Sequence, residues 1–175
     1  MITFSRTLKF ACLSAVLILG ACTHKQEAVN TAPPPAPPPP MAQPAPVTSR
    51  ILPGSAEDFR VNVGDTVHFG YNQYNIEDTD KAVLGRQAAW LAKYPSVRLT
   101  VEGHCDERGT REYNLALGAR RANAVKEYLV SQGVSTGRLE TISYGKERPI
   151  CTESDEACWA QNRRGVSTVT GGANS

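Results

Sequence analysis

The stretch VRLTVEGHCDERGTREYNLALGARRANAVKEYL, Val97–Leu129, contains a strand, a loop and a helix in that order. Apolar and polar residues alternate at its start, which predicts a half-buried strand over 97–102. Apolar residues then recur at helical spacing and predict a helix from about Thr110 to Gln132, with Thr110 as its N-cap and Gly133 at its C′ position. The predicted buried stripe of this helix consists of Leu115, Ala119, Ala122, Val125 and Leu129.

Weaker signals surround this unit. A second helix is predicted over 77–94, with Thr79 or Asp80 as its cap and Pro95 at its end. Its buried residues are expected to be Leu84, Ala88 and Leu91. The other expected elements are strands at 66–69, 139–143 and 166–169 and a short helix near 155–162. Strands that alternate with helices predict a small α/β domain with its helices on one face of the sheet.

The N-terminal residues are typical of an export signal rather than of a folded domain. A basic start and an apolar run from Phe10 to Leu19 are typical of a signal peptide, because about 20 apolar residues are needed to span a bilayer. Residues 19–22, Leu-Gly-Ala-Cys, resemble the lipobox of bacterial lipoproteins, in which Cys22 becomes lipid-modified. An ordinary signal peptide with an incidental cysteine is the alternative. The residue after Cys22 is Thr23 rather than Asp, and by this resemblance it favours the outer membrane.

A proline-rich segment separates this signal from the domain. Nine of the twelve prolines lie between Pro33 and Pro46, which favours extended polyproline II over a packed structure. We interpret the segment as a disordered, stiff tether, and a ligand for a proline-binding domain is the alternative. The predicted organisation is a signal peptide at 1–21, a lipidated cysteine and tether at 22–54, and a folded domain at 55–175.

Charge and cysteines limit the possible functions. Arg6 and Lys9 are the only charges of the signal, so the mature chain keeps 17 of 19 basic residues against 17 acidic ones. A near-neutral chain lacks the excess of positive charge that is typical of proteins that bind nucleic acid. Cys151 and Cys158 lie close together around a polar stretch, so a disulfide between them is favoured; it would contribute about 2–3 kcal/mol, though both could be free.

The loop after the central strand carries the most chemistry. Thr110, Asn114, Leu117 and Arg121 share one stripe of the following helix, so Arg121 can lean towards the loop that holds Asp106. If the two converge, the carboxylate can bind an ammonium group and the guanidinium a carboxylate, as in a receptor for a zwitterion. The alternative is that the two side chains simply pair with each other.

This stretch, with SYGKERP and Asn162-Arg163-Arg164 further on, resembles the OmpA-like peptidoglycan-binding domains over about 67–169. The resemblance implies a two-layer sandwich with helices on one face of a small mixed sheet. It also implies that the ligand is the meso-diaminopimelate of the wall peptide and that the aspartate and arginine of the family fall on Asp106 and Arg121. The family asparagine falls on Asn114. Further binding residues carried over in this way are Phe69, Gly70, Asn72, Thr110 and Arg163.

Two positions depart from the family pattern. An aspartate that contributes to binding in these domains is replaced by Asn72, which predicts weaker ammonium binding from that side without loss of the site. Cys105 stands where Ala, Thr or Ser is common, and it is expected to be a small buried residue.

Metal binding and catalysis are weaker interpretations. His104, Cys105 and Asp106 are adjacent, and neighbouring strand residues point to opposite faces, so they cannot close on one ion. Cys105 as a nucleophile would need a base within reach, and Asp106 and Glu107 are too close in sequence for the two carboxyl groups of a glycosidase. We therefore predict a protein that is not an enzyme and has no cofactor or metal, with a thiol-dependent periplasmic enzyme as the alternative.

Other residues receive structural roles. The His104 ring is expected to bond to nearby backbone or to contact a ligand, and Trp159 and Tyr144 are expected in the core. Glu107 and Arg108 are expected to form an exposed loop pair worth under about 1 kcal/mol. By resemblance, the protein tethers the outer membrane to peptidoglycan, faces the periplasm and meets the partner TolB during cell division. A purely structural, adhesin-like lipoprotein is a further alternative.

Overall fold

The computed structural model describes residues 51–175. The predicted signal peptide, Cys22 and most of the predicted tether lie outside the described residues. Within them, four strands form one mixed sheet in the order β1-β4-β2-β3. Strand β4 pairs antiparallel with both β1 and β2, whereas β2 and β3 are parallel. The strands are β1 (Thr66–His68), β2 (Arg98–His104), β3 (Leu139–Gly145) and β4 (Arg164–Gly171).

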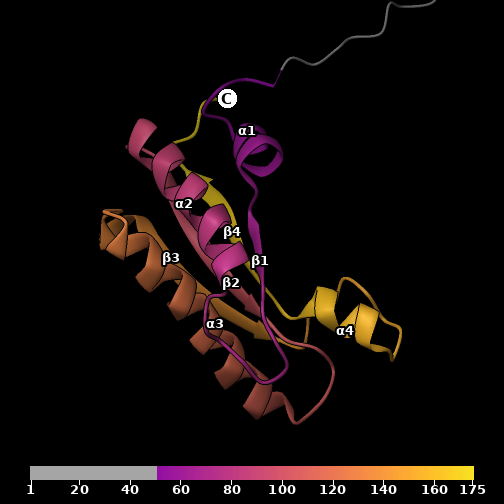
Figure 1. Ribbon diagram of the computed structural model, residues 1–175. Coiled ribbons are helices and arrows are strands. Elements are labelled where there is room, and N and C mark those ends of the chain that lie inside the picture. The colour runs from indigo at the N-terminus through magenta and orange to yellow at the C-terminus, as the bar shows by residue number, and fades with distance from the viewer. Residues whose placement is uncertain (1–50) are drawn as a thin grey trace, which may run out of the picture. The chain divides into compact units, whose positions relative to one another are not determined.

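Two long helices form the second layer. Figure 1 shows α2 and α3 side by side across one face of the sheet, and α4 at one end of it. This arrangement confirms the predicted two-layer α/β fold with helices on one face of a small mixed sheet. The helices are α1 (Ala56–Asp58), the π-helical turn η1 (Phe59–Val63), α2 (Asp78–Lys93), α3 (Arg111–Ser131), the 3₁₀ turn η2 (Thr136–Arg138) and α4 (Glu156–Asn162).

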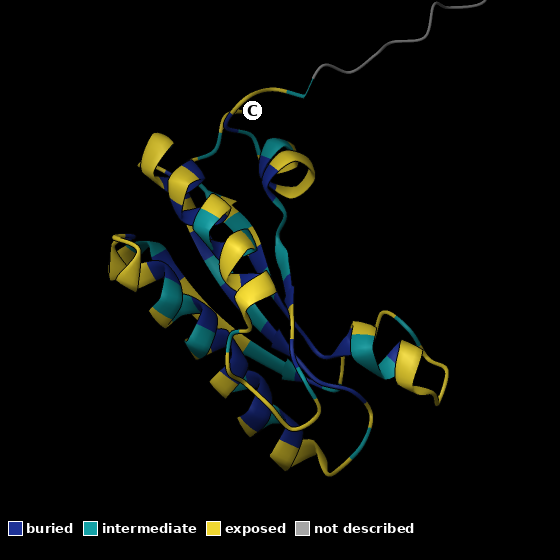
Figure 2. Cartoon of the chain, in the orientation of Figure 1, coloured by how far each residue is buried: buried dark blue, intermediate teal, exposed yellow. Residues whose placement is uncertain are grey.

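The hydrophobic core lies between the two layers. Alternate residues of β2, Leu99 and Val101, are fully buried and pack among apolar residues of both long helices. Figure 2 shows the same division along α2 and α3, whose buried stripes face the sheet while their outer sides are exposed. The helical contribution to the core is Leu84, Ala88, Trp90, Leu91, Ala122, Val125 and Leu129.

Helix α3 approaches β2 closely at two glycines. A Cβ atom added to Gly103 would lie 1.8 Å from the carbonyl oxygen of Gly118, and one added to Gly118 would lie 2.9 Å from the Gly103 oxygen. The two backbones therefore touch where any side chain would separate them. This contact fixes the start of α3 against the C-terminal end of β2, where the loop with Asp106 begins.

Several details of the predicted elements were wrong. Helix α2 begins after Glu77, not at Thr79 or Asp80, because the Asp80 carboxylate instead accepts a bond from the backbone N–H of His68 at 3.2 Å. Leu115 and Ala119 are only half-buried, since Leu117 and Gly118 face the core in their place. Strands β2, β3 and β4 are longer than expected, and α1 and η1 were not predicted.

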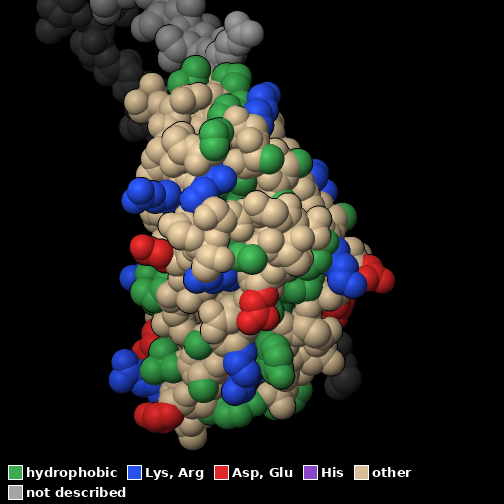
Figure 3. Space-filling view, turned by 90° about the vertical axis from the view of Figure 1, so that its left-hand side faces the viewer, with side chains coloured by type: hydrophobic (Ala, Val, Ile, Leu, Met, Phe, Trp, Pro, Cys, Tyr) green, Lys and Arg blue, Asp and Glu red, His purple; other side chains and the backbone are tan. Residues whose placement is uncertain are grey.

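The surface has no dominant charge. Figure 3 shows basic and acidic side chains scattered among apolar and other side chains on one face, without a continuous patch of one sign. This distribution agrees with the near-neutral balance of the sequence. Within residues 51–175, no helix has the length and apolar character that crossing a membrane requires.

Candidate functional site

A small cavity of about 120 Å³ lies at the end of the sheet where β2 stops. Three segments line it. The loop after β1 contributes Tyr71 and Asn72, and the loop after β2 contributes residues 105, 106, 108 and 109. The first half of α3 contributes Tyr113, Asn114, Leu117 and Arg121. Loops that leave strand ends are the usual place for ligand sites in α/β domains.

Asp106 is almost fully buried in the wall of this cavity. Its Oδ1 accepts bonds from the backbone N–H of Arg108 at 3.1 Å and from Nε of Arg108 at 3.2 Å, and its Oδ2 accepts from the Arg108 guanidinium at 2.6 Å. A second guanidinium, of Arg163, lies 3.5 Å from Oδ2. Burial alone would raise the pKa of Asp106, but the hydrogen bonds from Arg108 outweigh it and hold that pKa below its usual value. The carboxylate is therefore charged at neutral pH.

Arg121 is fully buried and serves as a junction between segments. It donates to three backbone carbonyls, those of Gly70 at 3.1 Å, Gln73 at 2.8 Å and His104 at 2.8 Å. Its guanidinium thereby ties the loop after β1 to the end of β2. Three of its five N–H donors are used in this way, which leaves two.

Asp106 and Arg121 lie on the same cavity, as the stripe along α3 predicted. The alternative, that they pair with each other, is wrong, because no ion pair joins them within residues 51–175. Asp106 pairs with Arg108 and Arg163, and Arg121 bonds to backbone carbonyls. An acidic and a basic group thus face one opening without neutralising each other directly.

The other residues expected at the site divide into two groups. Asn72 and Asn114 line the cavity beside Asp106 and Arg121. Four others do not line it and act on its walls: Phe69, Gly70, Thr110 and Arg163. The carbonyls of Phe69 and Gly70 accept from Arg163 and Arg121 respectively, and the Thr110 hydroxyl caps α3 by accepting from the N–H of Tyr113 at 3.2 Å.

The two asparagines hold loop conformations. Asn114 donates to the carbonyls of Arg108 at 2.8 Å and Thr110 at 3.0 Å, which fixes the loop that carries Asp106. Asn72 has a positive φ of 56°, a conformation that asparagine tolerates better than most residues. Its side-chain oxygen accepts a hydrogen bond from the hydroxyl of Tyr113 on α3. The loop after β1 is thereby held to the helix across the cavity.

Arg108 is the important residue that the sequence did not reveal. Its guanidinium carbon lies over the rings of both Tyr71 and Trp159, 4.1 Å and 4.0 Å from their centroids. The expected pair between Glu107 and Arg108 does not form, because Arg108 bonds to Asp106. Glu107 instead accepts bonds from Ser154 and Trp159. Trp159 is half-buried and stacks on Arg108, so its expected place in the core was also wrong.

His104 also differs from expectation. Its ring is buried on the sheet face away from the long helices, and neither ring nitrogen has a hydrogen-bond partner, so it does not bond to backbone. It packs against Tyr144, whose ring centroid lies 5.4 Å away, and Nε2 lies 3.4 Å from a Glu102 oxygen. Tyr144 is half-buried on this outer face and stacks on Arg148 instead of joining the core.

Cys105 is buried, with its sulfur 3.4 Å from the carbonyl oxygen of Asn114. Burial raises the pKa of this thiol, which keeps it protonated at neutral pH and unsuited to nucleophilic attack. Within the described residues, no group of three or more potential metal ligands is close enough to hold an ion.

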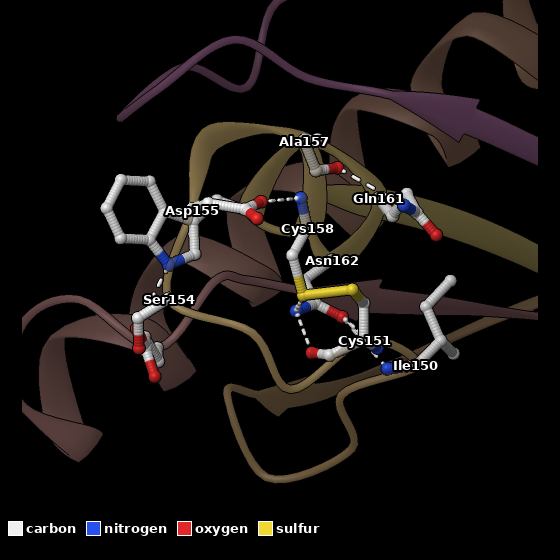
Figure 4. Close-up of a disulfide and its surroundings, with 10 residues drawn as sticks. Ile150, Cys151, Ser154, Asp155, Ala157, Cys158, Gln161 and Asn162 are labelled. Atoms are coloured by element: carbon white, nitrogen blue, oxygen red, sulfur yellow. Dashed lines mark hydrogen bonds between the residues drawn. A yellow bond between two sulfur atoms is a disulfide. The ribbon is translucent and has the colours of Figure 1, made fainter. Parts of the chain in front are cut away.

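A disulfide shapes the segment that supports Trp159. Cys151 and Cys158 are joined, with their Cα atoms 5.3 Å apart, and Figure 4 shows the bridge beside Asn162. The Asn162 side chain donates to the carbonyl of Cys151 at 2.7 Å and accepts from the N–H of Ile150 at 2.8 Å. Asp155 caps α4 by accepting from the N–H of Cys158 at 2.8 Å. These contacts hold α4 in place next to the cavity.

The fold is that of a known class of domain. The sequence matches the OmpA family over residues 68–163, a range that includes the last residue of β1, the whole of β2 and β3, and the whole cavity, and that ends just before β4. The chain belongs to this family.

Its relatives include the peptidoglycan-associated lipoproteins of Rhizobium meliloti, 60% identical over 70% of this chain and 69% of that protein, and of Agrobacterium fabrum, 58% identical over 69% and 68%. A crystal structure of the peptidoglycan-associated lipoprotein from Burkholderia pseudomallei is also similar. It has a TM-score of 0.60 and 42% identity over 61% of this chain and 90% of that one.

Proposed function

We propose that this chain is a lipoprotein of the outer membrane whose domain binds peptidoglycan from the periplasmic side. Membership of the OmpA family and similarity to peptidoglycan-associated lipoproteins support this proposal. The observation that carries it is the cavity that Asp106 and Arg121 share without pairing to each other. The protein acts by binding, and it is not an enzyme.

The proposed ligand is the meso-diaminopimelate of the wall peptide. The free end of its side chain carries an ammonium and a carboxylate on one carbon, so both charges arrive close together. Asp106 is the partner for the ammonium, and the two remaining donors of Arg121 are the partner for the carboxylate. Asn72 supplies only an uncharged oxygen, which predicts weaker binding of the ammonium than an aspartate there would give.

The N-terminal part of the chain connects this binding site to the outer membrane. A lipid on Cys22 anchors one end in the outer membrane, and residues 22–54 span the distance to the wall. One site of modest affinity suffices, because many copies on one polymeric wall give avidity. We extend the proposal to a role in the Tol–Pal system, with TolB as a partner and envelope integrity and cell division as the process served.

Binding to purified sacculi tests the proposed site. Asp106→Asn removes the charge at constant size, and Arg121→Lys keeps the charge but removes the planar donors. Both variants are expected to lose at least about tenfold in retention on sacculi of the diaminopimelate type, which corresponds to about 1.4 kcal/mol. The wild-type chain should prefer such sacculi to those of the lysine type, whose side chains lack the carboxylate.

Neighbouring residues provide matched controls. Glu107→Gln and Arg120→Gln remove an exposed carboxylate and an exposed guanidinium one position away from each test residue. Both are expected to bind as the wild type does. Circular dichroism of all four variants separates loss of binding from loss of fold. Unchanged retention of folded Asp106→Asn and Arg121→Lys proteins would contradict the site, and equal binding to both types of sacculi would favour the adhesin-like alternative.

The thiol-dependent enzyme is not supported by any observed contact. Cys105 is buried, the pKa of its thiol is raised, and the adjacent His104 ring lies on the other face of the sheet. Alkylation of Cys105 at neutral pH is therefore expected to be slow.

A further inference from the structure

The proposed ammonium site is already full. A carboxylate has about four lone-pair positions for hydrogen bonds. Arg108 uses three of those on Asp106, through one backbone and two side-chain N–H groups, and the Arg163 guanidinium lies against the remaining oxygen position at 3.5 Å. An incoming ammonium therefore cannot simply add to Asp106. It has to replace a donor that is present.

Only one of these donors is free to leave. The Arg163 side chain is buried and anchored at both ends, by the Phe69 carbonyl at 2.9 Å and by Glu156 at 2.7 Å. The Arg108 side chain is 29% exposed and comes from the loop that borders the cavity. Replacement at Asp106 thus means displacement of the Arg108 guanidinium.

The surroundings of Arg108 suit a side chain with two positions. Its guanidinium lies over the rings of both Tyr71 and Trp159, and cation–π attraction extends to about 6 Å from a ring centroid, so the group can shift and keep this contact. A second carboxylate oxygen, on Glu156, lies 3.9 Å away on an exposed side chain. A guanidinium that leaves Asp106 therefore has another acidic partner within reach. Asp106 in turn keeps its charge, because the incoming ammonium takes the place of the Arg108 guanidinium while the backbone N–H of Arg108 and the Arg163 guanidinium stay beside it.

We propose that Arg108 is a built-in competitor that occupies the ammonium position of the ligand-free site and sets which ligands enter. This inference rests on the proposed binding of a zwitterion at Asp106 and Arg121. A ligand must bring its own cation to exchange with Arg108, so neutral and N-acylated wall fragments are excluded. Asp106 and Arg121 determine where the ligand binds. The contact between Arg108 and Asp106, which the ligand has to break, lowers its net affinity.

The test compares wild type with Arg108→Gln by calorimetric titration with a soluble tripeptide that ends in meso-diaminopimelate. Removal of the competitor is expected to tighten binding about three- to tenfold, because an ionic donor no longer has to be displaced. Arg111→Gln is the control, since it removes the same charge from a residue that does not line the cavity and that forms an exposed ion pair with Glu147. The control should bind within about twofold of wild type.

Trp159 gives a second readout. Trp90 is the other tryptophan, so a Trp90→Phe background isolates the Trp159 emission. Saturation with the tripeptide should change this emission when Arg108 is present, because its guanidinium then moves relative to the Trp159 ring. In Arg108→Gln there is no such guanidinium, and the emission should stay unchanged. Binding by Arg108→Gln that is equal to or weaker than wild type, or an unchanged emission in the wild-type background, would overturn the competitor role while leaving the proposed function intact. No binding by either protein would overturn both.

Discussion

At the scale of single residues, the contact between Gly103 and Gly118 leaves no room for a side chain at either position. Gly103→Ala would place a methyl group 1.8 Å from a backbone oxygen of α3, which the helix can relieve only by moving off the sheet. We expect a loss of about 1–3 kcal/mol in the free energy of unfolding, measured by urea denaturation. Gly137→Ala is the control, because nothing lies within 4 Å of an added Cβ there. Equal stability of the two variants would contradict the close approach.

His104 gives the domain a stability that depends on pH. Burial, together with the charges of Arg164 and Arg148, lowers the pKa of His104 to about 4, against an ordinary value of about 6.5. The nearby Glu102 carboxylate opposes this effect, but it is partly exposed and also bonds to Thr168. Because the unfolded chain takes up this proton first, stability falls as pH falls from about 6.5 towards 4, by up to about 3 kcal/mol.

The measurement is the free energy of unfolding at pH 7 and at pH 4.5. The wild type is expected to lose most of the roughly 3 kcal/mol of stability between pH 7 and pH 4.5. His104→Gln carries no titrating group at this position and should lose about 2 kcal/mol less. If both proteins change equally with pH, the buried neutral histidine does not account for the dependence.

The site shows which residue roles a sequence can reveal. Helical spacing placed Arg121 on a stripe that can lean towards the loop of Asp106, and the family resemblance assigned both residues to one site. Spacing could not reveal Arg108, because its contact with Asp106 depends on the shape of a loop. The ring of Trp159 lies 51 positions further along the chain and reaches Arg108 only through the position of α4. Such contacts belong to tertiary structure and leave no periodic signal.

At the scale of elements, α4 depends on its disulfide. Cys151→Ser with Cys158→Ser reopens a loop of a few residues and is expected to lower the free energy of unfolding by about 2–3 kcal/mol. The control is reductant, which should destabilise the wild type by a similar amount and leave the double variant unchanged. Cys105 is buried and unpaired in residues 51–175, so it does not interfere. Equal stability of oxidised and reduced wild type would contradict a structural bridge.

The elements with strong periodicity were also the ones that the sequence predicted well. Helices α2 and α3 were placed within a residue or two, since Pro95 and Gly133 mark their ends and their apolar stripes are long. The turn before Gly64 was missed because five residues are too few to show a period. The strand ends were underestimated because Gly103 and Arg164 extend the pairing without adding to an apolar pattern.

At the scale of the whole molecule, the proposal separates anchoring from wall binding. Cys22→Ser removes the proposed lipid site and should move the full chain from the membrane fraction to the soluble periplasmic fraction. Retention on sacculi should not change, because that site lies within residues 69–163. Cys12→Ser, which leaves the lipobox intact, is expected to stay with the membrane. Membrane retention of both variants would contradict the anchor at Cys22.

The order of the strands has a consequence for how the chain is made. Strand β4 is the last element of the chain, yet it lies inside the sheet and pairs with both β1 and β2. Until the ribosome has released residues 164–171, β1 has no partner strand at all. The sheet therefore cannot be completed from the N-terminal end onward, because β1 is joined to the rest of it only through a strand that is made later. A chain without residues 164–171 would keep only the parallel pairing of β2 with β3, and β1 would have no partner strand.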